Sequence, residues 1–310
     1  MQSRNLLFAG VTRGRAKRPT VKTVQSQNLV SPSAFSVRRA AFRKLHESGC
    51  FVIPNPWDAG TARYLRHLGF PALATTSGGF AFSQGLPDGE QVTRDMVLAH
   101  IAAIVAATDL PVNADFESGY AKDPDGVAAS MKLCVETGVA GLSIEDATGD
   151  RAKPLFDLPV AVERIQAARA AIDDSGSGVL LTGRAECFLV DHPDPLRESI
   201  RRLQAYAEAG ADVLYAPGPT KREDIQAIVQ ACHPKPVNVL MSSNVGLKIS
   251  DFAEMGVRRV STGSSLARAA WTGFIHAAKK IAEEGSPEGF DGMVPYSELN
   301  QFFLKDFRKR

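Results

Sequence analysis

Residues 110–146 read LPVNADFESGYAKDPDGVAASMKLCVETGVAGLSIED and contain one complete copy of the pattern that decides the fold. Val112 opens a short apolar run that predicts a buried strand, and Gly141 opens a second one. Between them, Pro124 stands where a helix should begin and Gly138 where it should end. A strand, a helix and another strand in this order predict a parallel β–α–β unit.

The same unit recurs along most of the chain. Strands are predicted at residues 50–54, 72–76, 112–115, 141–144, 179–183, 213–216, 237–240 and 259–262. The helices that follow them are predicted at residues 58–68, 93–108, 124–137, 161–172, 195–209, 221–231, 248–255 and 264–282. Eight such units predict an α/β fold, a closed (β/α)8 TIM barrel with a C-terminal helical extension. An open doubly wound sheet is the alternative, but no G-x-G-x-x-G motif follows the first strand.

Two segments flank the repeated units. Residues 1–35 form a basic extension, because ten Lys and Arg residues precede the first acidic residue, Glu47. Their composition resembles an organellar transit peptide, and a disordered extension or an upstream start codon is the alternative. Residues 36–310 are predicted as one catalytic domain that ends in an amphipathic helix, Tyr296–Phe307. The apolar side of this helix needs cover from its own barrel or from a neighbouring subunit.

Composition and charge exclude several classes of protein. From Glu47 onward, 26 basic residues stand against 34 acidic ones, a formal charge of −8 that argues against nucleic-acid binding. No apolar run approaches the roughly 20 residues that a membrane span needs. The four cysteines form no C-x-x-C pair, so we expect reduced thiols. The expected compartment is the cytoplasm, or the mitochondrion if the extension is a transit peptide.

Acidic side chains and one arginine follow the middle strands. Asp115 and Glu117 come after the third strand, Glu145 after the fourth and Arg184 after the fifth. In a barrel these strand ends meet at one face, where catalytic groups gather. Converging carboxylates need a cation, and Mg²⁺ with oxygen ligands suits, while Arg184 offers a fork for a substrate carboxylate. Taken singly, such acids also cap helices and Arg184 also suits an ion pair with Glu186; together they predict a site.

Five short motifs resemble, in order and spacing, the isocitrate lyase/phosphoenolpyruvate mutase superfamily, and the resemblance covers about residues 40–285. The specific part is the D-x-[DE]-x-G-Y motif followed by I-E-D, whereas S-G-G alone is also typical of a turn. The motifs are Ala74-Thr75-Thr76-Ser77-Gly78-Gly79, Leu86-Pro87-Asp88-Gly89, Asn113-Ala114-Asp115-Phe116-Glu117-Ser118-Gly119-Tyr120, Ser143-Ile144-Glu145-Asp146 and Gly183-Arg184-Ala185-Glu186.

The resemblance implies a metal site and a set of catalytic side chains. Asp115 would be the direct ligand of Mg²⁺, or of Mn²⁺ in its place. Glu117 and Glu145 would hold metal-bound waters, and family members often have Asp where Glu117 stands. Asp88 would lie on a mobile rim near those waters. The catalytic side chains implied are Asp88, Glu145 and Arg184.

The resemblance also implies a substrate site. Backbone N–H groups of the S-G-G turn would hold the substrate carboxylate or a developing enolate oxygen, and an arginine would bind a second oxygen. The substrate would be a small 2-oxo acid or a related dicarboxylate, and the protein a homo-oligomer, either a dimer or a tetramer. The substrate-binding residues implied are Ser77, Gly78, Gly79, Arg184, Tyr215 and Asn238.

One departure from the family pattern narrows the set of expected reactions. Family members that cleave isocitrate or methylisocitrate carry a Lys-Lys-Cys-Gly-His-Cys motif after the fourth strand, but residues 147–156 contain neither Cys nor His. We therefore expect a Mg²⁺-dependent lyase with an enolate intermediate, best matched by oxaloacetate-type decarboxylation or another C–C cleavage. A phosphonopyruvate or carboxyphosphonoenolpyruvate mutase or hydrolase is one alternative, and a non-catalytic binding barrel is another. A Schiff-base aldolase is disfavoured, because Lys235 precedes its strand.

Overall fold

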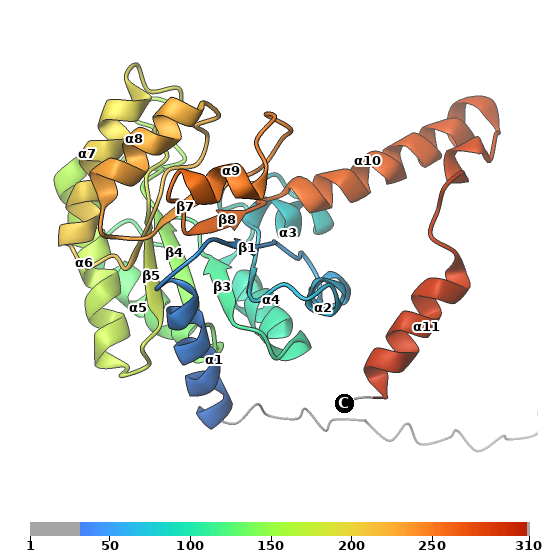
Figure 1. The fold of residues 1–310 in the computed structure, drawn as a ribbon, viewed down its shortest axis with the longest axis horizontal. Coiled ribbons are helices and arrows are strands. Elements are labelled where there is room, and N and C mark those ends of the chain that lie inside the picture. The colour runs from blue at the N-terminus through green and yellow to red at the C-terminus, as the bar shows by residue number, and fades with distance from the viewer. Residues whose placement is uncertain (1–31, 309–310) are drawn as a thin grey trace, which may run out of the picture. The chain divides into compact units, whose positions relative to one another are not determined.

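Eight short parallel strands form one sheet that closes on itself (Figure 1). In the computed structural model, which describes residues 32–308, the sheet order is β1-β8-β7-β6-β5-β4-β3-β2. The Ala74 N–H donates to the Pro54 carbonyl across 3.0 Å and links the two edges. The predicted TIM barrel is therefore confirmed. The strands are β1 (Phe51–Ile53), β2 (Leu73–Ala74), β3 (Val112–Asp115), β4 (Gly141–Glu145), β5 (Leu180–Arg184), β6 (Val213–Tyr215), β7 (Val237–Leu240) and β8 (Arg259–Ser261).

A helix follows each strand, as the sequence predicted. Several of these helices begin at aspartates, because the side chains of Asp58, Asp123 and Asp194 accept hydrogen bonds from backbone N–H groups of the first turn. The main hydrophobic core lies between the strands and these helices. The helices are α2 (Ala59–His67), α4 (Arg94–Ala107), α5 (Pro124–Glu136), α6 (Leu158–Asp174), α7 (Pro195–Glu208), α8 (Arg222–Cys232), α9 (Ile249–Glu254) and α10 (Ser265–Lys279).

Helix α1 (Pro32–Leu45) precedes the barrel and was not predicted. Its Phe42 is fully buried in a cluster with Phe51 and Leu180, the first residues of β1 and β5. Helix α1 therefore covers the N-terminal ends of the strands, which we call the floor of the barrel. The predicted basic extension overlaps this helix at residues 32–35, and residues 1–31 lie outside the described part of the chain.

The C-terminal helix α11 (Tyr296–Phe307) has the predicted bounds. Its Phe302 ring packs on Tyr64 of α2 with 5.1 Å between ring centroids. Its Asp306 forms ion pairs with Arg63 and Arg66, which also belong to α2. The barrel therefore covers part of the apolar stripe, whereas Phe307 stays exposed. A π-helical turn (Lys280–Glu284) and a 3₁₀ turn (Glu288–Phe290) connect α10 to α11. None of the helices within residues 32–308 is both long and apolar enough to cross a membrane.

Candidate active site

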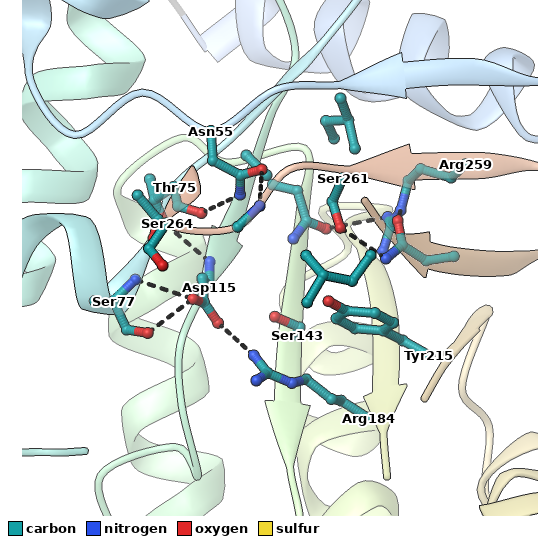
Figure 2. Close-up of a pocket in the computed structure, with 18 of the residues that line it drawn as sticks. Asn55, Thr75, Ser77, Asp115, Ser143, Arg184, Tyr215, Arg259, Ser261 and Ser264 are labelled. Carbon is teal, nitrogen blue, oxygen red and sulfur yellow. Dashed lines mark hydrogen bonds and ion pairs between the residues drawn. The ribbon is translucent and has the colours of Figure 1, made fainter. Parts of the chain in front are cut away.

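A cavity of about 170 Å³ opens among the strands of the barrel (Figure 2). It is smaller than the roughly 300–1,000 Å³ typical of drug-sized ligand sites, so it suits a ligand of a few carbon atoms. Asn55 closes it between β1 and β8, because the Asn55 side chain accepts from the Thr262 and Gly263 N–H groups at 2.9 Å. Predicted site residues that line the cavity are Ser77, Gly78, Asp88, Asp115, Arg184, Tyr215 and Asn238.

Asp115, the last residue of β3, joins the two halves of the predicted site. Its Oδ2 accepts from the Ser77 N–H at 2.9 Å and from the Ser77 hydroxyl at 3.0 Å. Its Oδ1 accepts from Arg184 Nη1 at 3.2 Å (Figure 2). The Asp115 N–H donates to Thr75 Oγ1 at 2.8 Å, which fixes the strand end itself. The carboxylate is thus held from both sides at the edge of the cavity.

Arg184, the last residue of β5, is surrounded by carboxylates. It forms ion pairs with Asp115, with Glu145 at 2.9 Å and with Glu186. Burial alone would lower the pKa of the Arg184 guanidinium, but the three carboxylates raise it well above its usual value. Burial also raises the pKa of Glu145, against the opposing effect of Arg184. Arg184 therefore forms the ion pair with Glu186 that the sequence offered as an alternative, and it also lines the cavity.

Glu117 lies behind Asp115 on a strained loop. Its φ of 44° and the φ of 55° at Tyr120 fall in the left-handed region that few side chains adopt. The Tyr120 hydroxyl donates to Glu117 Oε1 at 3.2 Å, but Glu117 Oε2 is buried without a hydrogen-bond partner. Burial, followed by the charges of Asp115, Asp88 and Glu90, raises the pKa of Glu117 to about 8. A buried carboxylate oxygen with no donor is suited to face a cation or its bound water.

These residues fit a magnesium ion that binds mostly through water. Within residues 32–308, no three His, Cys, Asp or Glu side chains are arranged to ligate one ion together. Mg²⁺ keeps several waters and takes one or two carboxylates directly, so it does not require such a cluster. Asp115 lines the cavity, whereas Glu117 and Glu145 do not. This placement matches one direct ligand backed by two carboxylates that reach the ion through water.

The Ser77-Gly78-Gly79 segment forms the start of a short helix, α3 (Ser77–Ser83), instead of an isolated turn. The Gly79 N–H donates to the Thr76 side chain at 3.2 Å, and Gly79 does not line the cavity. A Cβ at Gly79 would lie 2.6 Å from Thr76, so this glycine permits close packing. The Gly78 N–H has no acceptor among the described residues. Ser77 and Gly78 are therefore the two predicted cradle residues that face the cavity.

Asp88 lies on the exposed loop between α3 and α4, yet its carboxylate reaches the cavity. A Cβ at Gly78 would lie only 2.8 Å from Asp88 Oδ2, so the absence of a side chain at Gly78 makes room for this acid. Partial burial of the carboxylate, and then the charge of Asp115, raise the pKa of Asp88. The structure thus brings Asp88 to the same side of the cavity as Asp115.

The opposite wall holds two predicted residues and two that sequence reasoning missed. Tyr215 and Asn238 line it as predicted, together with Arg259 and Ser261 of β8 (Figure 2). The signal for Arg259 was the Arg258-Arg259 doublet, because adjacent strand residues point to opposite faces and one of two arginines must face the interior. It was overlooked because Arg259 is the first residue of its strand.

The loop after β4 folds back on itself beside the cavity. Ala147 and Leu155 form an antiparallel bridge, and the Thr148 N–H donates to the Pro154 carbonyl at 2.9 Å. Below the loop, the Arg164 guanidinium lies 4.1 Å from the centre of the Phe156 ring. The loop is therefore short and internally hydrogen-bonded, and its Phe156 packs on the buried Arg164 of α6.

Comparisons with known proteins show the family of the chain. The family model described as phosphoenolpyruvate phosphomutase matches residues 42–282. A solved structure from Burkholderia cenocepacia, described as that of a lyase/mutase, is 46% identical with a TM-score of 0.83, over 87% of this chain and 97% of that one. An uncharacterized Mycobacterium tuberculosis protein is 33% identical over 87% of this chain and 98% of its own length. Oxaloacetate decarboxylase of Bradyrhizobium diazoefficiens is 29% identical over 82% of this chain and 88% of that enzyme.

Proposed function

The chain belongs to the phosphoenolpyruvate phosphomutase family, within the isocitrate lyase/phosphoenolpyruvate mutase superfamily, and on this premise we propose that it is a Mg²⁺-dependent carbon–carbon lyase. Its proposed substrate is a small 2-oxo acid or a related dicarboxylate. The observation that carries the proposal is the position of Asp115, held between the Ser77 N–H and Arg184 at the edge of a small cavity. This arrangement supports the proposal, because a carboxylate that could bind the metal lies next to a backbone donor and a guanidinium that could bind the substrate.

Asp115 would hold the ion directly, and Glu117 and Glu145 would hold two of its waters. When bound, Mg²⁺ or Mn²⁺ supplies positive charge next to the oxygen on which negative charge develops. The buried, unpartnered Oε2 of Glu117 supports this assignment, because it lacks any protein donor within the described residues.

The chain's own groups bind the substrate and stabilise the charge that forms. The Gly78 N–H would donate to the substrate carboxylate or to the developing enolate oxygen, and the Ser77 N–H would join it once Asp115 exchanges that bond for the metal. Arg184 would bind a second oxygen, since its fork fits a carboxylate. In the decarboxylation that we favour, the bond between C3 and the leaving carboxylate breaks, CO₂ departs, and the electron pair forms the enolate of pyruvate. A proton from solvent water then adds to C3 and gives pyruvate.

The loop after β4 favours this reaction over cleavage of isocitrate type. Residues 147–156 offer no Cys or His as an acid, and loss of CO₂ needs no acid at the bond that breaks. A phosphorus–carbon mutase or hydrolase is the second candidate, because the family model is that of a phosphomutase. It would use the same metal and the same cradle, so the substrates themselves must distinguish the two.

We also propose that the protein is a homo-oligomer, either a dimer or a tetramer. Helix α10 exposes Trp271, Phe274 and Ile275, and exposed apolar side chains grouped on one helix are typical of a protein–protein contact. Light scattering coupled to size exclusion would give the mass in solution. A mass of one chain at micromolar concentration would disprove this part of the proposal.

The decisive experiment is a substrate panel with and without metal. Purified protein is incubated with oxaloacetate, phosphonopyruvate, 2-methylisocitrate and 2,3-dimethylmalate, in Mg²⁺ and then in excess EDTA, and products are followed by NMR. We expect Mg²⁺-dependent turnover of oxaloacetate that Asp115→Ala abolishes. Asp95→Ala, at an exposed position far from the cavity wall, is the matched control. Turnover of phosphonopyruvate alone would select the second candidate, and no turnover by a folded protein would favour a non-catalytic barrel.

A further inference from the structure

The far wall of the cavity contains a buried cation that no acid neutralises. Arg259 is only 3% exposed, lines the cavity and forms no ion pair with any residue between 32 and 308. All four of its hydrogen-bond acceptors are neutral. They are Asn238 Oδ1 at 2.8 Å, Thr182 Oγ1 at 3.1 Å, Asn113 Oδ1 at 3.5 Å and His46 Nε2 at 3.5 Å.

His46 is neutral as well, and its proton position follows from its neighbours. Its Nδ1 lies 2.8 Å from the Phe42 carbonyl, which only accepts, so Nδ1 carries the proton. Its Nε2 is then the acceptor for Arg259. Burial, and then the positive charge of Arg259, lower the pKa of His46 to about 3. The residue that follows helix α1 therefore supplies the floor with an acceptor but with no counter-charge.

Hydrogen bonds on this wall run from Arg259 toward the cavity. Arg259 Nε donates to Asn238 Oδ1, and Asn238 Nδ2 donates to Ser261 Oγ at 3.0 Å. The Ser261 hydroxyl in turn interacts with the Tyr215 hydroxyl. The Ser261 hydroxyl also donates to the Val239 carbonyl at 3.5 Å, a long and therefore weak bond that an incoming ligand can replace. Both hydroxyl residues line the cavity.

The sheet register places this wall opposite the metal side. Arg184, Tyr215, Asn238 and Arg259 are register partners on the four adjacent strands β5 to β8. Strands of such a barrel tilt by about 36°, so a row across them descends toward the floor. Figure 2 shows Tyr215 between the two arginines, with Ser77 and Asp115 beyond Arg184. One cavity thus has an arginine at each end.

We propose that Arg259, with Ser261 and Tyr215, forms a second anion subsite that binds the remote acid group of the substrate. The inference rests on the proposed function, which places the 2-oxo acid end at Ser77, Gly78 and Arg184. It deepens that function, because it selects substrates with two acid groups over those with one. The remote group is a carboxylate or a phosphonate, since both are anions that accept from guanidinium and hydroxyl donors.

A desolvated cation without a counter-ion is costly to a folded protein unless another anion completes it. Arg184 already has three carboxylates, so a ligand must share it with them. Arg259 has none, and an incoming acid group is its first full counter-charge. The far wall therefore discriminates between ligands by charge more strongly than the metal wall does.

The test measures binding by calorimetry in Mg²⁺, with probes matched in length. 2-Oxobutyrate carries one acid group, whereas 3,3-difluorooxaloacetate and 3-phosphonopyruvate carry two. We expect wild-type protein to bind both diacids at least tenfold more tightly than 2-oxobutyrate. Arg259→Met should bring that ratio close to one and change the affinity for 2-oxobutyrate by less than about twofold. Arg258→Met is the matched control, because the Arg258 side chain bonds Gly49 outside the cavity, and it should leave the ratio unchanged.

A second variant keeps the proposal testable if Arg259→Met fails to fold. Asn113→Asp adds a carboxylate of the same shape beside Arg259 and should raise the melting temperature while it removes the preference for diacids. A purely structural role for Arg259 predicts the gain in stability without the loss of preference, and that result would overturn the proposal. So would a wild-type ratio near one. Binding is measured apart from turnover, so the two proposals can fail separately. If diacids bind through Arg259 but do not react, the subsite is supported and the proposed lyase activity is wrong.

Discussion

The two walls of the cavity each contain a buried arginine, and the surroundings of the two arginines are opposite in charge. On the wall of β3 to β5, Arg184 lies among Asp115, Glu145 and Glu186. On the wall of β7 and β8, Arg259 meets only neutral acceptors. The first arginine balances an acidic network that also suits a metal ion. The second leaves a net positive charge that a ligand can use.

The largest expected effect is a difference in stability between the two arginine variants. Arg184→Met leaves buried carboxylates without their cation and should lower the free energy of unfolding by about 3–5 kcal/mol. Arg259→Met removes a charge that had no partner, at the cost of a few unmade hydrogen bonds, and should change it by about 2 kcal/mol or less. Urea denaturation of both proteins in EDTA measures the difference.

Charge, not side-chain length, should account for that difference. Arg184→Lys keeps a cation among the same carboxylates, so we expect it to recover most of the lost stability although it loses the fork. Equal losses for the two methionine variants would show that the contrast between the walls has no energetic consequence.

The next effect concerns the metal wall alone. Glu117→Gln removes the buried carboxylate whose Oε2 has no partner, and it should weaken the apparent Mg²⁺ affinity by about 10–100-fold, the usual cost of losing an outer-shell group. Saturating Mg²⁺ should restore most of kcat, because the direct ligand Asp115 remains. Metal titration of activity measures both quantities. Glu136→Gln, at an exposed helix end, is the control, and an unchanged Mg²⁺ affinity in Glu117→Gln would remove Glu117 from the site.

The metal wall could be predicted from the sequence, whereas Arg259 on the far wall was missed, for a geometric reason. Asp115, Glu145 and Arg184 end their strands, and the carboxyl ends of barrel strands meet at one face. Arg259 begins its strand, so the same rule places it away from the site. The tilt of the strands brings the first residue of β8 into the row of the last residue of β5. Only the register reveals this, and a sequence does not encode register locally.

Local signals also misled at two helices. Ser77-Gly78-Gly79 was expected to be a turn, but Thr76 caps a helix there, and tertiary packing against Trp57 and Ala267 offsets the low helix propensity of two glycines. Helix α1 lies within a basic segment with no acidic residue, so it lacks the usual charge signal at its start. Its burial of Phe42 against the strands, a long-range contact, is what accounts for the helix.

Two glycines offer a matched comparison of the floor with the metal wall. A Cβ at Gly141 would lie 2.6 Å from both Asn113 and Phe42, in the closely packed floor, so Gly141→Ala should cost about 1–3 kcal/mol of stability. A Cβ at Gly78 would displace only the carboxylate of Asp88, on an exposed loop, so Gly78→Ala should lower kcat with less change in stability. Thermal melts and initial rates, with Gly273→Ala in open space as the control, separate the two effects. Equal losses of stability would mean that the floor and the metal wall are equally rigid.

The smallest expected effect is the dependence of stability on pH at the floor. The pKa of His46 is lowered to about 3 in the folded protein by burial and then by Arg259, and its usual value is 6.5. Below pH 6.5 the unfolded chain therefore binds a proton that the folded chain does not, and stability falls as the pH falls toward 3. Between pH 6.5 and 5.5 the loss should be about 1 kcal/mol.

His46→Gln should remove that loss, because glutamine still accepts from Arg259 but does not titrate. The groups that face His46 are Arg259, Arg258 and Arg43, and all three stay charged over this range, so the difference between variant and wild type reports His46 alone. Most carboxylates titrate below this pH range, and their contributions cancel when the curve of the variant is subtracted from that of the wild type. Parallel pH curves for the two proteins would show that His46 is free to protonate, which its burial and then the charge of Arg259 oppose. The comparison of the two walls would then fail at its base, because Arg259 would no longer act as an uncompensated cation.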